Sequence, residues 1–414
     1  MTATKSPQWV DGFKADYDKL FVKKWSSYLG AVLLMVVIFA LMINGMVWGV
    51  FGGVKFWGNW LNTAIGLGPW LGLPAESGPI WMHSMSLMNI MLVMGAFCAA
   101  LLSRQFAPLR PPKIEYLWAA LGGTLMGIGA SLAGGCTTGG FFNPVLHASP
   151  AGWAMWVGLL AGAAVGFKML LWTLEHVEWG TQAPAVWQLP KGVTMALPWW
   201  GGMVALGTLV LATLWFYSGN APLVYRAPIV LAGFAIGFIM HRSRLCFARA
   251  FREPFVTGEG EMSKAVILAL AIGLPVAALL FQKKVIDPYA AIPATFWIGS
   301  LVGGLIFGMG MVFAGGCASG SLWRMGEGHI KLWVAMFFFA WSGSTASALF
   351  KKYGLTAIVE DGTDTFDRTA LGFQAFMPEL LSSWGWTLWV SGGLLLLWYA
   401  LVRYNESTEK FTLM

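Results

Sequence analysis

The chain has 414 residues, of which 57% are hydrophobic and only 11% are charged, whereas about 25% of the residues in an ordinary soluble domain are charged. With 24 tryptophans as well, this composition excludes a soluble globular domain and predicts an all-α polytopic membrane protein that sits in a lipid bilayer. The formal net charge of +7 is modest, and basic residues of membrane proteins gather in cytoplasmic loops, so no nucleic-acid partner is expected.

The apolar segments predict the number of membrane crossings. A spanning helix needs about 20 mainly apolar residues. Some of the glycine-rich segments are expected to stop inside the membrane, so we predict about nine or ten transmembrane helices. The candidate segments, in chain order, are 28–51, 83–103, 116–133, 152–174, 200–217, 226–241, 264–282, 295–313, 331–350 and 384–402.

The loops between these segments predict an orientation. The first apolar run, 28–51, is longer than the core of about 7–15 residues in a signal peptide, and it predicts a spanning helix with a cytoplasmic N-terminus. The basic stretches 104–113 and 241–253 agree with this, because cytoplasmic loops are rich in Lys and Arg. The Trp-rich residues 54–82 and the acidic residues 360–367 are expected on the external side.

A glycine-rich motif occurs twice in the chain. The stretch "GGTLMGIGASLAGGCTTGG" spans 122–140, and "GGLIFGMGMVFAGGCASGS" spans 303–321. At a fixed offset of 181 residues, nine of the nineteen positions are identical, with Cys136 in register with Cys317. A weaker match pairs Cys98 with Cys246, each followed six residues later by an arginine, which is Arg252 in the second copy. Two homologous halves are typical of transporters, whose substrate sites lie on interrupted helices between the halves.

The repeat divides the chain into five parts. The two repeats are flanked by an N-terminal extension and by a C-terminal segment, and a connector separates them. We expect 1–82 to hold a cytoplasmic head, an extra transmembrane helix and an external Trp-rich loop, 83–174 to form the first repeat, 175–225 to form a connector with one helix, 226–350 to form the second repeat, and 351–414 to hold an external loop, the last helix and a tail.

The duplicated motif has the chemistry of an anion site. Paired glycines release the backbone from the helix, and free N–H groups are tolerated at membrane depth only if they are buried in protein or line a polar cavity. Such N–H groups, with nearby hydroxyls, bind anions. A thiol is soft and polarisable, so it suits an anion with a terminal sulfur or selenium atom better than a hard oxyanion. The candidate binding residues are Cys136, Cys317, Cys98, Cys246, Gly134, Gly135, Thr137, Thr138, Gly315, Gly316, Ser319 and Arg252.

Other interpretations of these residues stay open. A buried cysteine is often a small hydrophobic residue, and the arginines of 242–252 also fit a role in setting the topology. The four cysteines are far apart in sequence and do not resemble a disulfide framework. No C-x-x-C or H-E-x-x-H motif occurs, so neither a metal site nor a cofactor is expected.

The motifs "LAGGCTTGG", "FAGGCASGS" and "RSRLCFARAFRE" resemble those of the YeeE/YedE family of sulfur-transport membrane proteins. The resemblance implies a bacterial inner-membrane protein that takes up thiosulfate through a duplicated, hourglass-like helical fold with short loops that dip to its centre. It implies that cysteines pass the ion by S–H···S contacts, with Cys136 and Cys317 central, Cys98 third and Cys246 its repeat mate. It also implies a soluble TusA-type sulfurtransferase as a cytoplasmic partner, and selenium metabolism for some members.

Three functions remain. The first is a permease for a small sulfur-containing anion, thiosulfate above all, or for a selenium species in the same fold. The second is a membrane sulfur-relay subunit in which a cysteine, best Cys246 among its arginines, forms a persulfide, because an activated thiolate needs nearby positive charge. The third is a receptor without flux. No nucleotide-binding motif occurs, so direct ATP coupling is not expected. As a transporter the protein is not expected to be an enzyme, and catalysis stays open only for the persulfide relay.

Overall fold

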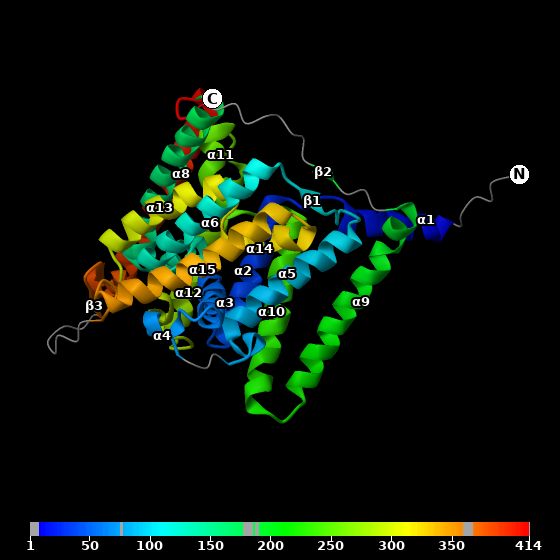
Figure 1. Ribbon diagram of the computed structural model, residues 1–414, viewed down its shortest axis with the longest axis horizontal. Coiled ribbons are helices and arrows are strands. Elements are labelled where there is room, and N and C mark those ends of the chain that lie inside the picture. Colours follow the sequence, from blue (N-terminus) through cyan, green and yellow to red (C-terminus); the bar gives the residue numbers. More distant parts are fainter. Residues whose placement is uncertain (1–7, 75–77, 177–184, 187–189, 359–366, 414) are drawn as a thin grey trace, which may run out of the picture.

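The computed structural model describes residues 8–74, 78–176, 185–186, 190–358 and 367–413, and most of them are helical (Figure 1). In this part of the chain, nine helices or broken helices are long and apolar enough to cross a membrane. The number is ten if α1 and α2, which meet at a 75° bend, count as one span. The prediction of a multi-pass all-α membrane protein with nine or ten spans is therefore confirmed.

The elements follow one another with short connections. The helices are α1 (Gln8–Tyr17), α2 (Ser27–Ile43), α3 (Phe51–Ala64), α4 (Gly68–Leu71), α5 (Ser84–Leu102), α6 (Lys113–Ala133), α7 (Asn143–Leu146), α8 (Pro150–His176), α9 (Lys191–Phe216), α10 (Ala221–Ser243), α11 (Phe247–Val256), α12 (Glu261–Gln282), α13 (Ile298–Ala314), α14 (Ala318–Glu327), α15 (Ile330–Lys352), α16 (Met377–Leu380) and α17 (Trp384–Thr408). Short turns are η1 (Asp18–Val22), η2 (Ile80–Met82), η3 (Thr137–Phe142) and η4 (Pro288–Ala291), and two-residue strands pair as β1 (Leu109–Arg110) with β2 (Ala185–Val186) and β3 (Arg368–Thr369) with β4 (Gly372–Phe373).

The crossing of α6 and α13 lies at the centre of the bundle. A Cβ added to Gly129 would lie 2.6 Å from the carbonyl oxygen of Gly303, and one added to Gly303 would lie 2.6 Å from that of Gly129. Gly122 and Gly310 make the same reciprocal contact, with distances of 2.6 and 2.7 Å. The two backbones touch, and only glycine permits this approach. The repeated glycines of the sequence therefore meet one another.

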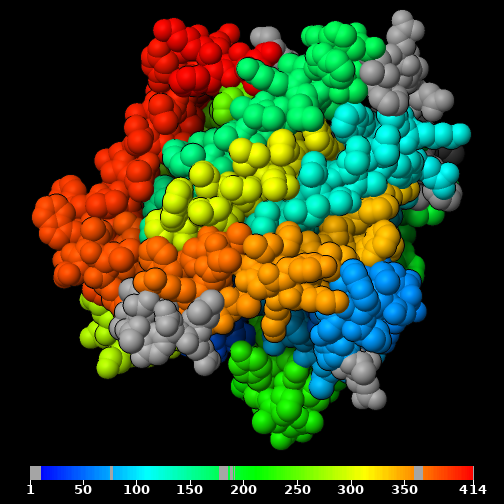
Figure 2. Space-filling view, turned by 60° about the vertical axis from the view of Figure 1, so that its left-hand side comes forward, coloured from blue at the N-terminus to red at the C-terminus, as the bar shows by residue number. Residues whose placement is uncertain are grey.

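The helices around this crossing also pack in matching pairs. α15 packs along α6 as α8 packs along α13, and α10 packs along α5 as α2 packs along α12. Figure 2 shows one face of this bundle, with α13 in yellow and α15 in orange. α9 lies at the edge, against α5 and α10, with most of its apolar side chains exposed (Figure 1).

Two sets of loops collect on opposite faces of the bundle. On the N-terminal face, the Tyr17 hydroxyl donates to the carbonyl of Leu102 at 2.5 Å, and the Leu413 amide donates to that of Phe255 at 2.8 Å. On the opposite face, the Thr369 hydroxyl donates to the carbonyl of Ala294 at 2.7 Å. Which face is cytoplasmic stays a prediction; of the acidic stretch, residues 360–366 lie outside the described residues.

The Trp-rich stretch 54–82 is not simply a loop, because most of α3 lies in it. The Asn62 side chain donates to the Ser344 hydroxyl of α15 at 2.9 Å, and a Cβ on Gly58 would lie 1.9 Å from the carbonyl oxygen of Ala340. The many Trp, Gly and Pro residues of this stretch made it look like an external, partly interfacial loop. Close packing on α15 and polar contacts with it stabilise the helix instead.

The crossing leads to a stability prediction. Gly129→Ala and Gly303→Ala insert a methyl group against immobile backbone, so each is expected to destabilise the protein by about 1–3 kcal/mol. Gly202→Ala on α9 is the matched control, because nothing lies within 4 Å of the place that a Cβ would take there. Melting temperatures of the full chain in detergent measure the effect. Equal melting temperatures for all three variants would contradict the proposed importance of the crossing.

Candidate functional site

Three of the four cysteines occupy the same structural position. Cys136 precedes η3, Cys246 precedes α11 and Cys317 precedes α14, and each is the cap residue of the short helix that follows. In each case a long helix stops, two or three residues form a break, and a short helix continues the span. The local backbone places each thiol at a helix N-terminus, where unpaired N–H groups attract negative charge.

The two copies of the motif have the same local geometry. Gly134 and Gly315 end the preceding helices with left-handed φ angles of 73° and 81°, which a side chain rarely adopts. The cysteines that follow have φ and ψ of −80° and −169° at Cys136, and −79° and 177° at Cys317. The sequence repeat therefore produces the same turn twice.

Hydroxyls lie beside both thiols. The Cys136 thiol donates to the Thr138 hydroxyl at 3.6 Å, and the sulfur of Cys317 lies 3.7 Å from the Ser319 hydroxyl. The Gly320 amide donates to the Cys317 sulfur at 3.3 Å. Among the described residues, the buried Thr137 hydroxyl has no hydrogen-bond partner. A donor that is buried without a partner is costly, which favours its use by a ligand.

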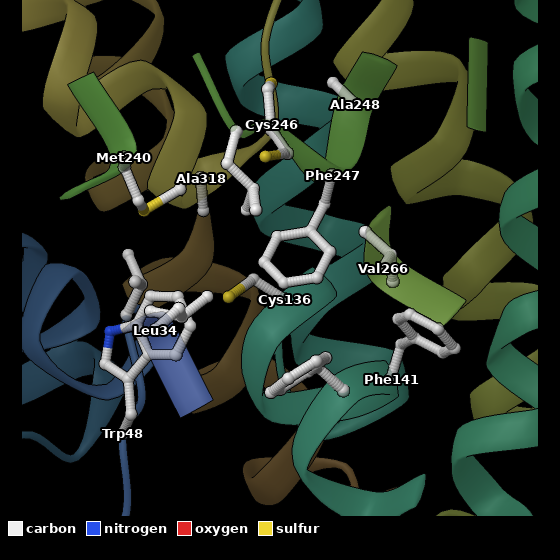
Figure 3. Packing of buried hydrophobic residues seen from close by; sticks show 14 of the residues in the cluster. Leu34, Trp48, Cys136, Phe141, Met240, Cys246, Phe247, Ala248, Val266 and Ala318 are labelled. Carbon is white, nitrogen blue, oxygen red and sulfur yellow. The ribbon is translucent and has the colours of Figure 1, made fainter. Parts of the chain in front are cut away.

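Cys246 and Cys317 lie close together. A Cβ placed on Gly320 would lie 2.7 Å from the Cys246 sulfur and 3.1 Å from the Cys317 sulfur, so Gly320 leaves the space between them open. Cys136 belongs to the same buried apolar cluster, and Figure 3 shows Cys136 and Cys246 around the ring of Phe247. All three are fully buried.

Cys98 lies in different surroundings. It is inside α5 instead of at a helix start, and its thiol donates to the carbonyl of Gly201 on α9 at 3.3 Å. It does not belong to the apolar cluster that holds the other three cysteines. The structure therefore brings together Cys136, Cys246 and Cys317, and places Cys98 on the α9 side of the bundle.

A cavity of about 470 Å³ opens behind the first motif, on the face opposite the N-terminus. Its wall includes the backbone of Gly134, Gly135 and Gly139 and the side chain of Asn143. Two cations, Lys55 of α3 and Lys351 of α15, also line it. We call this cavity the lysine basin. Sequence reasoning missed both lysines, because nothing near them in the sequence resembles a site.

Within the part of the chain that the structure describes, the positive charge of the lysine basin has no acidic partner. Neither lysine has a carboxylate within ion-pair distance among the described residues, and Lys55 instead lies 5.9 Å from the centroid of the Phe51 ring. Burial, and then the charge of Lys351, hold the pKa of Lys55 below its usual value. An anion in the basin would relieve both effects, because it offsets the lost solvation and the like-charge repulsion.

A second group of cations lies on the other side of the thiols. The Arg324 guanidinium donates to the carbonyl of Gly315 at 3.1 Å, and the Lys331 ammonium lies 3.2 Å from a carboxylate oxygen of Glu115. Arg252 interacts electrostatically with Cys246 and Arg324, and its Nε has no hydrogen-bond partner among the described residues. Arg252 was a sequence candidate; Arg324, seven residues after Cys317, could have been found from its place on the same helix.

The described residues hold no group of three or more His, Cys, Asp or Glu arranged as metal ligands.

A family profile described as sulphur transport matches residues 3–165 and 242–413, which is most of the chain. The chain belongs to this family. This agrees with the YeeE/YedE resemblance of the motifs, and the unmatched segment 166–241 contains all of α9.

Named relatives agree with this assignment. The probable transporter YedE of Escherichia coli (strain K12) is 29% identical over 70% of this chain and 73% of its own length. The thiosulfate transporter TsuA of the same organism is 37% identical over 26% of this chain and 30% of its length. The thiosulfate transporter TsuA of Spirochaeta thermophila is 30% identical over 39% of this chain and 53% of its length.

The lysine basin leads to a prediction about pH. Because the pKa of Lys55 is lowered, its neutral, nucleophilic amine forms at lower pH than in an ordinary lysine, and an amine-reactive reagent should label it there. Lys351→Met removes the nearby charge, raises the pKa of Lys55 and moves this labelling to higher pH. Lys352→Met is the matched control, because Lys352 binds the carbonyl of Trp70 instead. Peptide mapping across a pH series measures the shift, and identical pH profiles for both variants would contradict it.

Proposed function

We propose that this protein is an inner-membrane permease for a small sulfur-containing anion, and that the anion is thiosulfate. The observation that carries this proposal is the order of the groups across the bundle. The lysine basin opens on one face, the thiols of Cys136, Cys246 and Cys317 lie at the centre, and Arg252 and Arg324 follow on the other side. Cations at both ends with soft donors between them suit a dianion that carries a terminal sulfur.

The weak contacts that thiols would make with the anion suit its transport better than its tight binding. A thiol is a weak hydrogen-bond donor, and a conducting path must bind its ion loosely enough for release. Thr137 and Thr138 supply hydroxyls at the first motif, and Ser319 supplies one at the second. We infer that the ion passes from one thiol to the next, with the backbone N–H groups of the glycine loops facing it.

The thiols are covered in this structure. Trp48, Phe142 and Phe247 pack on one another beside Cys136 and Cys246, with ring centroids 5.3–6.4 Å apart. An apolar constriction of this kind excludes hydrated ions until side chains move. We infer that the rings form the gate between the lysine basin and the central thiols.

The two motif turns, in our proposal, are re-entrant loops from two homologous halves. The reciprocal packing supports an assignment in which α2 to α8 form one half and α10 to α15 form the other. The N-terminal face is proposed to be cytoplasmic, because the basic stretches 104–113 and 241–253 lie on it. A TusA-type sulfurtransferase would then receive the ion at this face.

Two alternatives use the same residues. The hydrogen selenide anion exposes an equally soft selenium atom, whereas the terminal atoms of selenite are oxygen. Competition of selenide, and of selenite as the hard-anion comparison, with labelled thiosulfate in proteoliposomes separates the substrates. In a sulfur relay, the Cys246 thiolate would attack the terminal sulfur of thiosulfate, so that the S–S bond breaks, sulfite leaves and a persulfide forms. The charges of Arg252 and Arg324 favour that thiolate. A stable mass of one added sulfur on Cys246, after exposure to a sulfur donor, would favour the relay over the permease.

Cysteine variants test the path. Loss of one hydrogen bond to a charged group costs about 1.5–3 kcal/mol, so Cys136→Ala and Cys317→Ala are each expected to slow thiosulfate uptake about 10- to 100-fold. Cys98→Ala is the matched control and should transport normally, because its thiol faces α9. Uptake of labelled thiosulfate by a strain without other thiosulfate transporters measures this. Normal uptake by both motif variants would rule out the thiol path.

A further inference from the structure

A second polar cluster lies near the thiols on the N-terminal face, and the proposed path does not use it. The cluster consists of His241 at the end of α10, Glu327 at the end of α14, and His329 directly before α15. His241 is fully buried, and Glu327 is 8% exposed. Ionisable residues buried within membrane spans are expensive, and they commonly mark ion or proton pathways.

The carboxylate of Glu327 is shared by three basic groups. Nη1 of Arg244 lies 2.6 Å from Oε1, Nε2 of His329 lies 3.3 Å from Oε2, and Nε2 of His241 lies 3.6 Å from Oε1. Neither ring nitrogen of His241 has a hydrogen-bond partner among the described residues. The His241 imidazole therefore lies just beyond hydrogen-bond range of an acid, in a position that a bound proton would make favourable.

The cluster is joined to the thiols by short rigid connections. α14 carries Cys317 at its start and Glu327 at its end, and Arg244 is two residues before Cys246. The ring of Trp323 lies between the two sites: His241 meets it edge-on with centroids 5.8 Å apart, and the Arg244 guanidinium lies 5.4 Å from its centroid. A change in charge at the thiols is therefore felt at Glu327 through Arg244 and α14.

A dianion needs a counter-movement of charge to enter a cell. An inside-negative potential of about 100 mV disfavours each inward negative charge about 50-fold at equilibrium. The permease proposed above has no nucleotide-binding motif to supply energy. Co-transported protons would offset the charge of the ion, and they would add the driving force of a pH gradient.

We propose that His241 is a proton-binding site that couples inward movement of the sulfur anion to inward movement of protons, with Glu327 as its counter-charge and His329 as its connection to the N-terminal face. This inference rests on the proposed permease function. His241 takes up a proton at Nε2 and closes on the Glu327 carboxylate. The proton leaves through His329, which is one-third exposed, and no bond to sulfur is formed or broken.

Arg244 makes the coupling reciprocal. With no anion at Cys246, Arg244 holds Glu327 and donates at 2.5 Å to the side-chain oxygen of Gln105. An anion beside Cys246 draws Arg244 away from Glu327, and the freed carboxylate then favours the protonated imidazole. The other charged groups around this cluster are Arg242, which follows His241 on α10, and Arg324 of α14, whose guanidinium lies 5.2 Å from the centroid of the Trp323 ring.

His147 is a natural control within the same protein. It is also a fully buried histidine, but its Nδ1 lies 2.9 Å from the backbone carbonyl of Asn143, and no carboxylate lies at ion-pair distance within the described residues. Burial lowers the pKa of His147 to about 4, so its ring stays neutral at physiological pH. A substitution of His147 therefore removes a buried imidazole that takes no part in the proposed proton movement.

The test uses the full-length protein in proteoliposomes, with labelled thiosulfate outside and a pH-sensitive dye inside. Under a gradient of about one pH unit, acid outside, the wild type should accumulate thiosulfate about tenfold for each coupled proton, and the lumen should acidify with uptake. His241→Gln and Glu327→Gln should lose this accumulation and the dye signal. Both should keep the exchange of internal for external thiosulfate, which needs no driving force and shows that the variants are folded. His147→Gln should behave as the wild type does.

Two results would overturn the coupling. Thiosulfate accumulation by the wild type that ignores the pH gradient would do so, and so would full pH-driven accumulation by His241→Gln. Wild-type protein that neither exchanges nor accumulates thiosulfate would refute the permease itself, and the coupling proposal with it.

Discussion

The backbone contact between α6 and α13 is the constraint on which the rest of this structure depends. Gly129 meets Gly303, and Gly122 meets Gly310, at distances that leave no room for a side chain. Without a hydrophobic force between helices in lipid, such close contact is one of the main sources of helix association. Because both helices end at a Gly-Gly-Cys turn, their crossing fixes where the two turns lie relative to each other.

The breaks in the helices determine where the cysteine thiols lie. Cys136, Cys246 and Cys317 each begin a short helix, so each thiol lies where backbone N–H groups point toward an anion. The lysine basin supplies charge on one side, and Arg252 and Arg324 supply it on the other. In the proposed site, the sulfur atoms need not be charged themselves, because the helix starts and the flanking cations would provide the attraction for an anion.

The sequence alone predicted the features that follow from the length of its apolar segments and from its repeated motif. The apolar segments predicted nine or ten spans, and the glycine register predicted that Cys136 and Cys317 share one geometry. It could not predict features that depend on which helices touch. Cys98 and Cys246 look alike in sequence, but one lies inside a helix and the other begins one. Nothing in the sequence distinguishes Lys55 from other lysines. It lines the basin together with Lys351 because α3 packs beside α15.

The break between α2 and α3 gives the path a direction. In the proposed assignment of two halves, it corresponds to the break that holds Cys246 between α10 and α11, yet it contains no cysteine, and Trp48 packs beside Phe142. Three of the four breaks carry a cysteine thiol, and the fourth carries the indole of Trp48. On the proposed path, an ion that leaves the lysine basin meets the aromatic rings first and the sulfur atoms afterwards, whereas an ion from the other face meets them in the reverse order. If the two halves are homologous as proposed, this single difference makes the two ends of the path unequal.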